Sequence, residues 1–452
     1  MTYSTLNFSK FLSSPDDKKE ELKSLIQTIE DGIRRKKTYL KRHEVLTELV
    51  KEFEDTINED IIYMDSLKIE LNSLKSKENV VANLIIESAI PKKKVNKLCA
   101  TLQTWLDKER TKKGFDEEKW TQKAVAKTLA YTKKCKIGCL ALNVSGGVDS
   151  SAVFAVLLRT QNEAPDNHPL NKNYSFTNDK GDRVVKPGKI VCAKQFIDGT
   201  KDITERIEEV FRDQAIKYNA TCEFDSNRNV SNIVSEKLNV EVHDLDLTND
   251  YHSLVQKLEK THGKLNLWAK SMYKSYLRTP QIFALASSNG GIVIGTGNRD
   301  EDGYLFYFCK FGDGAVDASF LWDLHKSEVF RVAKHLGVSK IVLNSPPSAD
   351  LAPGQTDEEE IGATYDFVEL LWKYYYEFSW LKKQYFLHCL KKDPEAYDQF
   401  MREKALVDAI HNRGLHKEDI NPKLLKDDLL PKPSYFERFT SFCGRSNASA
   451  AA

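Results

Sequence analysis

The sequence has no excess of charge of either sign and no long apolar run. Its 67 Lys and Arg side chains balance 66 Asp and Glu side chains, so the formal net charge is +1. Proteins that bind a nucleic-acid backbone non-specifically carry a clear basic excess, and we therefore expect no nucleic-acid partner. No apolar stretch approaches the roughly 18 residues of a membrane-spanning helix. The first residues show no secretory signal, and we expect a cytoplasmic protein without a membrane anchor.

Cysteine is also sparse. The eight Cys in 452 residues include no Cys-x-x-Cys pair and no His-rich neighbourhood. This distribution excludes a disulfide scaffold and argues against a zinc site. The length by itself predicts roughly two or three domains.

Proline and glycine are almost absent from the N-terminal part. No proline lies between Pro15 and Pro91, and Gly32 is the single glycine there. Apolar residues in this part recur at helical spacing, as in Leu22, Ile26, Ile29 and Ile33. We therefore expect residues 1–95 to form a helical extension. It is either a packed appendage or a coiled coil that binds an unknown partner.

After Pro91 the pattern changes to alternating strands and helices. Short apolar runs at 137–144, 190–196, 291–296 and 340–343 predict strands, and periodic stretches at 98–106, 120–131 and 203–218 predict helices. Such alternation predicts an α/β fold with a doubly wound parallel sheet, here over residues 96–390. Residues 161–189 are polar and predict an inserted loop, and residues 391–452 predict a helical and polar C-terminal tail.

A glycine-rich loop follows the first predicted strand. It reads Ser145, Gly146, Gly147, Val148, Asp149, Ser150, Ser151. Two glycines let a backbone turn approach a ligand, and the free amides of the following helix favour an anion. Asp149 would repel a phosphate, so it indicates a bridging cation such as Mg²⁺. The simplest alternative is a Gly-Gly turn with a serine cap. The chain has neither a Walker-type loop nor a dinucleotide fingerprint.

A second group, of polar residues and glycines, lies between 295 and 358. It comprises Gly295, Thr296, Glu301, Lys310, Gly312, Asp313, Gly314, Asp317, Lys326, Ser348, Gln355, Thr356, Asp357 and Glu358. Glu301 follows a predicted strand, as Asp149 does, and open α/β sheets bind ligands at the carboxyl ends of their strands. Two carboxylates there could hold Mg²⁺, and lysines could contact phosphate oxygens. Taken singly, the aspartates could cap turns and Lys326 could lie on a solvated face.

Together the loop and this ordered set resemble the NAD synthetases of the N-type ATP pyrophosphatase superfamily, over roughly residues 115–375. The resemblance implies an adenine nucleotide alpha-hydrolase-like sheet and a ligase. The enzyme would adenylate deamido-NAD with ATP, release pyrophosphate, and let ammonia displace AMP to give NAD. The 144 residues before the loop read mainly as helices, so we expect no glutaminase domain there. The family also implies a homodimer.

The resemblance assigns roles to individual residues. The loop from Ser145 to Ser151, with Thr296, Lys326 and Ser348, would contact ATP. Asp149 and Glu301 would bind Mg²⁺. The substrate-binding set would be Arg278, Lys310, Asp313 and Asp317, with Asp313 facing ammonia. The residues closest to the chemistry would be Asp149, Lys310, Asp313 and Lys326.

The sequence departs from the family pattern before the Gly-Thr strand. Tyr276 stands where a substrate-facing arginine is expected, and a phenol has no charged fork. Either Lys274 or Arg278 substitutes for it, or substrate binding differs. Pro280 predicts that a helix begins there. Asn143 replaces a small residue before the loop. Two alternative functions remain open: adenylation of another carboxylate or base, and a non-catalytic regulatory homologue.

Overall fold

The computed structural model describes residues 95–198, 201–347 and 356–418. The predicted extension lies outside these residues apart from its last position, and so do Ser348, Gln355 and the tail beyond residue 418. The described residues up to Gly414 belong to one compact unit, and the short turn Leu415–Lys417 (η5) belongs to a second. Among the described helices, none has the length and apolar character needed to span a bilayer.

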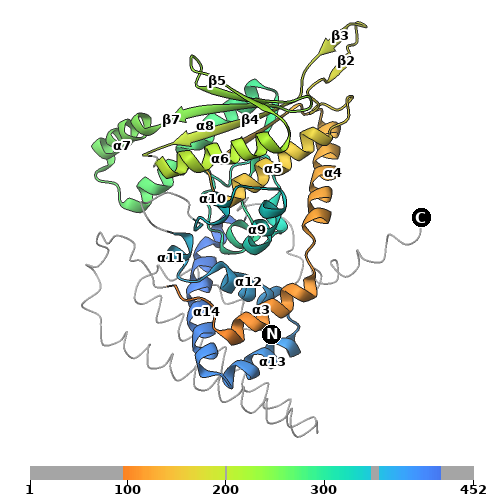
Figure 1. Ribbon diagram of the computed structural model, residues 1–452. Coiled ribbons are helices and arrows are strands. Elements are labelled where there is room, and N and C mark those ends of the chain that lie inside the picture. The colour runs from red at the N-terminus through yellow and green to blue at the C-terminus, as the bar shows by residue number, and fades with distance from the viewer. Residues whose placement is uncertain (1–94, 199–200, 348–355, 419–452) are drawn as a thin grey trace, which may run out of the picture. The chain divides into compact units, whose positions relative to one another are not determined.

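A seven-stranded sheet forms the centre of the fold (Figure 1). Its order is β5-β6-β7-β4-β1-β8-β9. Five strands run parallel: β7 (Asn239–Asp246), β4 (Lys189–Phe196), β1 (Cys139–Asn143), β8 (Gly291–Gly295) and β9 (Ala318–Ser319). Two antiparallel strands complete one edge: β5 (Thr221–Asp225) and β6 (Val230–Val234). The predicted α/β class with a mainly parallel, doubly wound sheet is confirmed.

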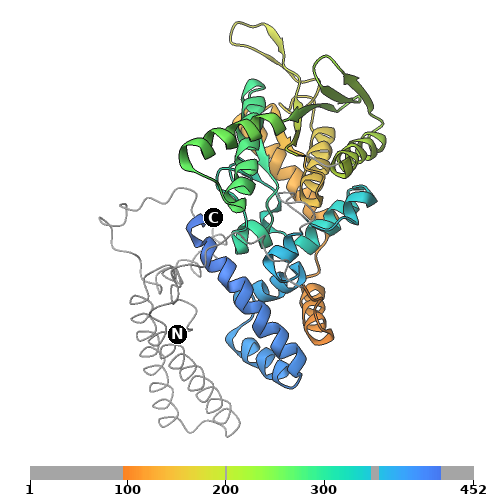
Figure 2. The same cartoon turned by 90° about the vertical axis from the view of Figure 1, so that its left-hand side faces the viewer.

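Helices cover both faces of the sheet, as Figures 1 and 2 show. Successive side chains on β1 point to opposite faces, so Leu140 and Leu142 pack on one side and Ala141 on the other. The first side is covered by α4 (Glu117–Cys135), α5 (Val148–Glu163), α6 (Lys201–Lys217) and α9 (Lys326–His335), and the second by α8 (Leu267–Ser288), beside which α7 (Thr248–His262) packs.

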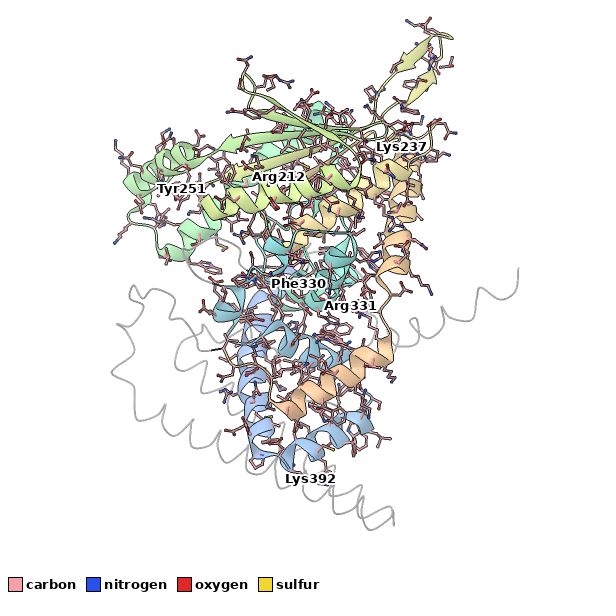
Figure 3. All side chains as sticks on the ribbon, in the orientation of Figure 1. Arg212, Lys237, Tyr251, Phe330, Arg331 and Lys392 are labelled. Carbon is pink, nitrogen blue, oxygen red and sulfur yellow. The ribbon has the colours of Figure 1, made fainter. Side chains whose placement is uncertain are left out.

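Arg331 of helix α9, labelled in Figure 3, contacts the start of α4. The Arg331 Nε donates to Glu117 Oε1 at 2.5 Å, and its Nη2 donates to the Phe115 carbonyl at 2.7 Å. A guanidinium that donates to a carboxylate and a carbonyl at once fixes two helices relative to one another.

A second apolar cluster is built from helices that follow or precede the sheet. These helices are α3 (Ala100–Lys113), α12 (Tyr365–Tyr376), α13 (Trp380–Lys391) and α14 (Pro394–Gly414), with the short α11 (Asp357–Ile361) before them. Phe386 lies between Trp105 and Phe400, with ring centroids 5.1 and 5.0 Å away in edge-on arrangements. The boundaries expected at residues 95 and 390 stay predictions.

Three local expectations were wrong or incomplete. Residues Lys340–Leu343 form a helical turn, α10, and not a fourth strand, because Ser339 Oγ caps it and only Val342 is buried. Helix α8 does not begin at Pro280 but runs through it, starting after Asn266, whose side chain accepts from the Ala269 amide. The lost hydrogen bond at the proline is offset by packing of the helix on the sheet.

The predicted loop at 161–189 contains regular structure. Helix α5 continues to Glu163, and an antiparallel hairpin follows, formed by β2 (Ser175–Thr177) and β3 (Arg183–Val185). Its strands have only three residues each and no apolar periodicity, so the sequence pattern could not distinguish them from a loop.

The ion pair between α3 and α12 should make stability depend on pH. Burial would raise the pKa of the Glu369 carboxyl, but hydrogen bonds from Arg110 and its charge outweigh this and lower the pKa from 4.5 to about 2. A carboxyl with a lowered pKa stabilises the fold fully above pH 4.5, and this contribution disappears as the pH falls toward 2. It amounts to about 3 kcal/mol.

We therefore expect Glu369→Gln to lower the free energy of urea unfolding at pH 7, with a difference from wild type that narrows as the pH falls below about 4.5. Glu395→Gln, on the exposed first turn of α14, is the matched control and should differ little from wild type at any pH. A Glu369→Gln effect that stays constant between pH 7 and pH 3 would contradict the assignment.

A second prediction concerns the core between α5 and α6. Phe154 is fully buried, and its ring meets Phe211 edge-on at 5.0 Å. We expect Phe154→Ala to lower the unfolding free energy by about 3 to 5 kcal/mol, because it leaves a cavity that the packed sheet cannot refill. Phe224→Ala on β5, where the ring is 63% exposed, should cost about 0.5 kcal/mol or less in the same urea titration. If both substitutions lowered the unfolding free energy equally, the assignment of Phe154 to the packed core would be wrong.

Candidate active site at the carboxyl ends of β1 and β8

The glycine-rich loop leads from β1 into the N-terminus of α5. Gly146 adopts a positive φ of 77°, and a Cβ there would lie 3.1 Å from Ile207 Cγ1, so the turn requires glycine. Ser150 Oγ and Ser151 Oγ both donate to the Gly147 carbonyl, at 3.1 and 2.8 Å. These buried hydroxyls hold the loop in shape, while Ser145 stays exposed. The loop therefore presents the first amides of a 16-residue helix, which favours an anion.

Three charged side chains from different elements meet beside this loop. The Lys326 Nζ, on the first turn of α9, lies 2.6 Å from Asp149 Oδ2 and 2.7 Å from Glu301 Oε1. The side chains of Asp149 and Glu301 are each 16% exposed, and that of Lys326 is 5% exposed. From the sequence we expected both carboxylates at strand ends and Lys326 in contact with ATP, with a solvated face as the alternative for the lysine taken singly. The structure buries Lys326 between the two carboxylates.

The electrostatics of this group follow from its burial. For Lys326, burial would lower the pKa of the ammonium, but Asp149 and Glu301 outweigh this and raise it. Burial raises the pKa of Asp149, and repulsion from Glu301 adds to the effect although Lys326 opposes it. For Glu301, burial is outweighed by Lys326 and by a hydrogen bond from Tyr365, so its pKa is lowered. The two carboxylates thus share one cation unequally.

Asn298, Tyr365 and Asp357 complete the group, and no individual role was predicted for any of them from the sequence. Asn298 Nδ2 donates to Asp149 Oδ1 at 2.9 Å, while Asn298 Oδ1 accepts from the amides of Asp300 and Glu301 at 3.0 Å. Asn298 thereby caps the π-helical turn Arg299–Leu305 (η3), whose start carries Glu301. An asparagine just before a helix is a recognisable cap signal. The contact with Asp149, 149 residues away, has no local signal.

Tyr365 donates a second hydrogen bond to Glu301, in addition to the one from Lys326. Its hydroxyl donates to Glu301 Oε1 at 2.6 Å and lies 3.2 Å from Asp357 Oδ2, and Lys326 Nζ lies 4.9 Å from the centre of its ring. Asp357 belongs to the Gln-Thr-Asp-Glu run that the sequence singled out. The capping box of Thr356 and Glu359 begins α11 at Asp357 and so places this carboxylate beside the tyrosine.

The segment from Lys310 to Asp317 lies against α8 and the sheet. Asp313 Oδ1 accepts from the Cys309 amide at 2.9 Å and from Ser275 Oγ at 3.3 Å. A Cβ on Gly312 would lie 2.0 Å from Ser275 Oγ, so only glycine allows this approach. The Asp317 carboxylate accepts from the Val293 amide at 2.8 Å and joins β8 to the chain before β9. These contacts hold the segment, and the substrate roles of Lys310, Asp313 and Asp317 stay predictions.

Two more of the predicted site residues, Thr296 and Arg278, belong to β8 and α8 or follow them directly. Thr296 follows β8 directly and is partly buried, and Arg278 lies partly buried on α8. Tyr276, in place of an expected arginine, is 39% exposed on the same helix. Lys274 Nζ lies 3.2 Å from Asp198 Oδ2, so this candidate substitute already has a carboxylate partner.

A glutamine that sequence reasoning missed links β1, β4 and α8. Gln195 Nε2 donates to Asn143 Oδ1 at 2.6 Å and to the Arg278 carbonyl at 2.9 Å. This explains the unusual Asn143 before the loop, because its side chain is the acceptor that orients Gln195. The Gln195 Oε1 is buried and has no hydrogen-bond partner among the described residues. Such an acceptor at the carboxyl edge of a sheet is available to an N–H group of a ligand.

The donor set fits one mode of Mg²⁺ binding. The described residues contain no group of three or more His, Cys, Asp or Glu side chains placed to hold a metal by themselves. Mg²⁺ in nucleotide-dependent enzymes is often held by one or two carboxylates together with phosphate oxygens. Asp149 and Glu301, beside an anion-binding loop, offer that arrangement and not a closed protein cage.

Comparisons with known proteins find one family and a set of related enzymes. Residues 214–388 match the family described as NAD synthase. The NH(3)-dependent NAD(+) synthetase of Syntrophomonas wolfei is 38% identical over 149 residues, which are 32% of this chain and 59% of that protein. The one from Pyrococcus horikoshii is 40% identical over 145 residues, which are 31% of this chain and 54% of that protein. The chain thus spans a little over half the length of these relatives.

Solved structures are more distant. The NMN synthetase of Francisella tularensis is 21% identical, with a TM-score of 0.47 that covers 71% of this chain and all of that chain. The NH3-dependent NAD synthetase of Campylobacter jejuni, in complex with the nitrate ion, is 15% identical with a TM-score of 0.41. The family match over residues 214–388 and the 38% and 40% identity to the two synthetases confirm that this chain resembles the NAD synthases.

Proposed function

We propose that the protein is a ligase that amidates deamido-NAD to NAD at the expense of ATP, with ammonia as the nitrogen donor. The observation that supports it most is the meeting of Asp149, Glu301 and Lys326 beside the α5 N-terminus. This arrangement suits ATP bound through its phosphates, and the family match supplies the substrate class.

The chemistry needs no nucleophilic side chain. The nicotinate carboxylate of deamido-NAD attacks the α-phosphorus of ATP and pyrophosphate leaves, which gives an NAD-adenylate. Ammonia then attacks the activated acyl carbon, AMP leaves, and the nitrogen loses a proton. The protein's part is to hold the two substrates in line and to stabilise the charge of the leaving groups.

The residues divide this task. The loop Ser145 to Ser151 and the first amides of α5 would bind the leaving pyrophosphate, with Thr296 and Lys326 close to it. Asp149 and Glu301 would hold Mg²⁺, which when bound neutralises phosphate charge and promotes departure of the pyrophosphate. Arg278, Lys310, Asp313 and Asp317 would contact deamido-NAD or ammonia. A homodimer stays a prediction.

One observation favours a second candidate. Tyr276 leaves the expected arginine position without charge, and Lys274 is paired with Asp198. The ATP chemistry would then be retained while another carboxylate takes the place of deamido-NAD. The two candidates differ in one result, namely whether deamido-NAD stimulates the release of AMP.

The first test uses the full chain with ATP, Mg²⁺, deamido-NAD and ammonium, and follows AMP and NAD. We expect both products in equal amounts. Asp149→Asn should lower kcat/KM about 100-fold or more, because the site loses one of its two carboxylates. Asp398→Asn, on the exposed side of α14, is the matched control and should keep full activity. AMP release that deamido-NAD does not stimulate would exclude the proposed substrate.

The second test removes one hydroxyl from the centre. Tyr365→Phe keeps the ring beside Lys326 but deletes the donor to Glu301, and we expect kcat/KM to fall about 10-fold. Tyr375→Phe is the matched control, because Tyr375 lies on the same helix as Tyr365 and its hydroxyl donates to a different carboxylate, that of Asp408 on α14. Equal activity of the two variants would remove Tyr365 from the site.

A further inference from the structure

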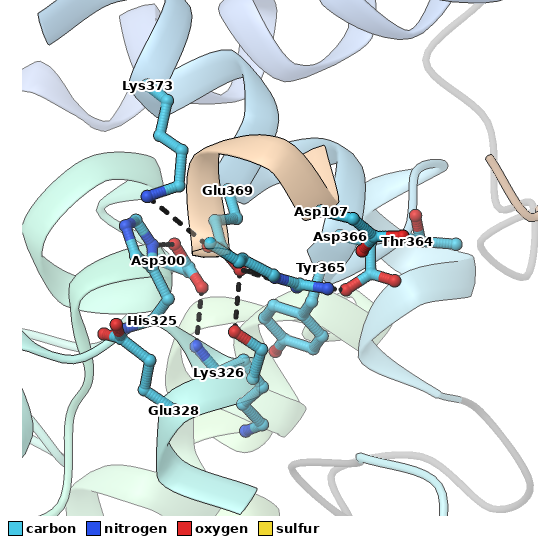
Figure 4. Close-up of polar contacts among 12 residues, drawn as sticks. Asp107, Asp300, His325, Lys326, Glu328, Thr364, Tyr365, Asp366, Glu369 and Lys373 are labelled. Atoms are coloured by element: carbon cyan, nitrogen blue, oxygen red, sulfur yellow. Dashed lines mark hydrogen bonds and ion pairs between the residues drawn. The ribbon is translucent and has the colours of Figure 1, made fainter. Parts of the chain in front are cut away.

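The first turn of α9 carries Lys326 and is held by side chains from several other elements (Figure 4). His325 Nδ1 lies 2.7 Å from Asp300 Oδ1, and the Lys326 amide donates to Asp300 Oδ2 at 2.7 Å. Asp300 and His325 are fully buried. Asp300 and Glu301 are adjacent in η3. The first accepts from the backbone amide of Lys326 and the second from its ammonium group.

Of the next two residues of the turn, Ser327 contacts a buried carboxylate and Glu328 carries one. Ser327 Oγ donates to Glu369 Oε2 of α12 at 2.7 Å. Glu328 accepts from the His325 amide at 3.1 Å, and its other oxygen lies 2.6 Å from Lys113 Nζ. The side chains of Glu369 and Glu328 are only 2% and 6% exposed. A carboxylate buried this deeply needs a cation, and helix α3 supplies one to each.

Helix α3 reaches both carboxylates from a single face. Arg110 Nη2 and Nε donate to Glu369 Oε2 at 2.6 and 3.0 Å, and Arg110 Nη2 also donates to Asp366 at 2.6 Å. Lys113, three residues on, pairs with Glu328. Residues three apart lie on the same side of a helix, so both cations face the N-terminus of α9. Helix α3 lies outside the segment 214–388 that matches the family.

We propose that Arg110 and Lys113 are positioning residues for Lys326, acting through Glu369 and Glu328. The inference rests on the proposed function, because it assigns α3 a part in that site. The first turn of a helix has free amides and frays easily, and a lysine has a long, flexible stem. The contacts at residues 325, 326, 327 and 328 hold the Lys326 backbone in place, so the ammonium reaches Asp149 and Glu301 together. A charged group displaced by about 1 Å can lose 100-fold in rate.

The test compares two single changes with matched controls. Lys113→Met removes the cation at Glu328, and Lys112→Met on the exposed adjacent position is its control. Ser327→Ala deletes only the hydroxyl that reaches Glu369, and Ser327→Thr restores a hydroxyl. Each full-length variant is assayed well below its unfolding temperature, after near-ultraviolet circular dichroism shows that it is folded.

We expect folded Lys113→Met and Ser327→Ala to lose about 10-fold in kcat, with KM for deamido-NAD changed less than twofold. Lys112→Met and Ser327→Thr should retain most of the wild-type kcat. Calorimetric titration with Mg·ATP should show weaker binding to the two test variants than to their controls. A purely structural role would lower the unfolding temperature and leave kcat and Mg·ATP affinity of the folded protein unchanged, and that result would overturn the inference.

The same measurements separate the two proposals. If wild type binds Mg·ATP but makes no NAD, the proposed function fails, and the Mg·ATP affinities of the variants still decide the role of α3. If wild type makes NAD and both test variants equal it in kcat and in Mg·ATP affinity, the proposed function stands and the positioning role fails.

Discussion

A single buried ammonium group, Lys326 Nζ, holds the site together. It lies within 2.7 Å of two carboxylates, one from the first turn of α5 and one from η3, and the three side chains are largely shielded from water. Without the cation, Asp149 and Glu301 would repel one another in a weakly solvated environment, and one of them would take up a proton. Lys326 thus allows two negatively charged carboxylates to lie close together.

The sheet explains why these groups meet. Strands β1 and β8 are neighbours and run parallel, so the segments that follow them leave the sheet at the same edge. Asp149 is placed by the turn after β1 and Glu301 by the capped turn after β8, where Asn298 contacts both segments. Helix α9 then brings Lys326 from the face that α4 and α5 also cover. Strand pairing sets the approach of the carboxylates, and helix packing sets that of the cation.

Charge pairing extends from this centre into the helical cluster. Asp300 contacts the backbone of Lys326, Ser327 contacts Glu369, and Arg110 contacts Glu369 in turn. Each buried carboxylate in the series has a donor, as the cost of burying an isolated charge requires. The cluster of α3, α12, α13 and α14 is therefore joined to the site by polar contacts as well as by apolar packing. Its helices α3 and α14 lie outside the segment that matches the family.

Local pattern was enough for the strands at 137–144, 190–196 and 291–296, for the glycine-rich loop, and for placing Asp149 and Glu301 at one edge of a parallel sheet. Apolar runs and glycine pairs act over a few residues, and the direction of parallel strands follows from their alternation with helices. The strand predicted at Lys340–Leu343 was wrong because a short apolar run is compatible with a helix turn as well as a strand. The helix start predicted at Pro280 was wrong because tertiary packing can offset one lost backbone hydrogen bond.

The partners of the site came only from the tertiary structure. Asn298, Tyr365 and Glu369 carry no local signal that links them to Asp149, Glu301 or the turn of Lys326, since the contacts join residues tens to more than a hundred positions apart. The same applies to the burial of Lys326, which depends on where α9 packs and not on the residues around it in sequence. Sequence pattern reports which side chains share a face or a strand end, whereas burial and pairing of charges are decided by the packing of distant elements.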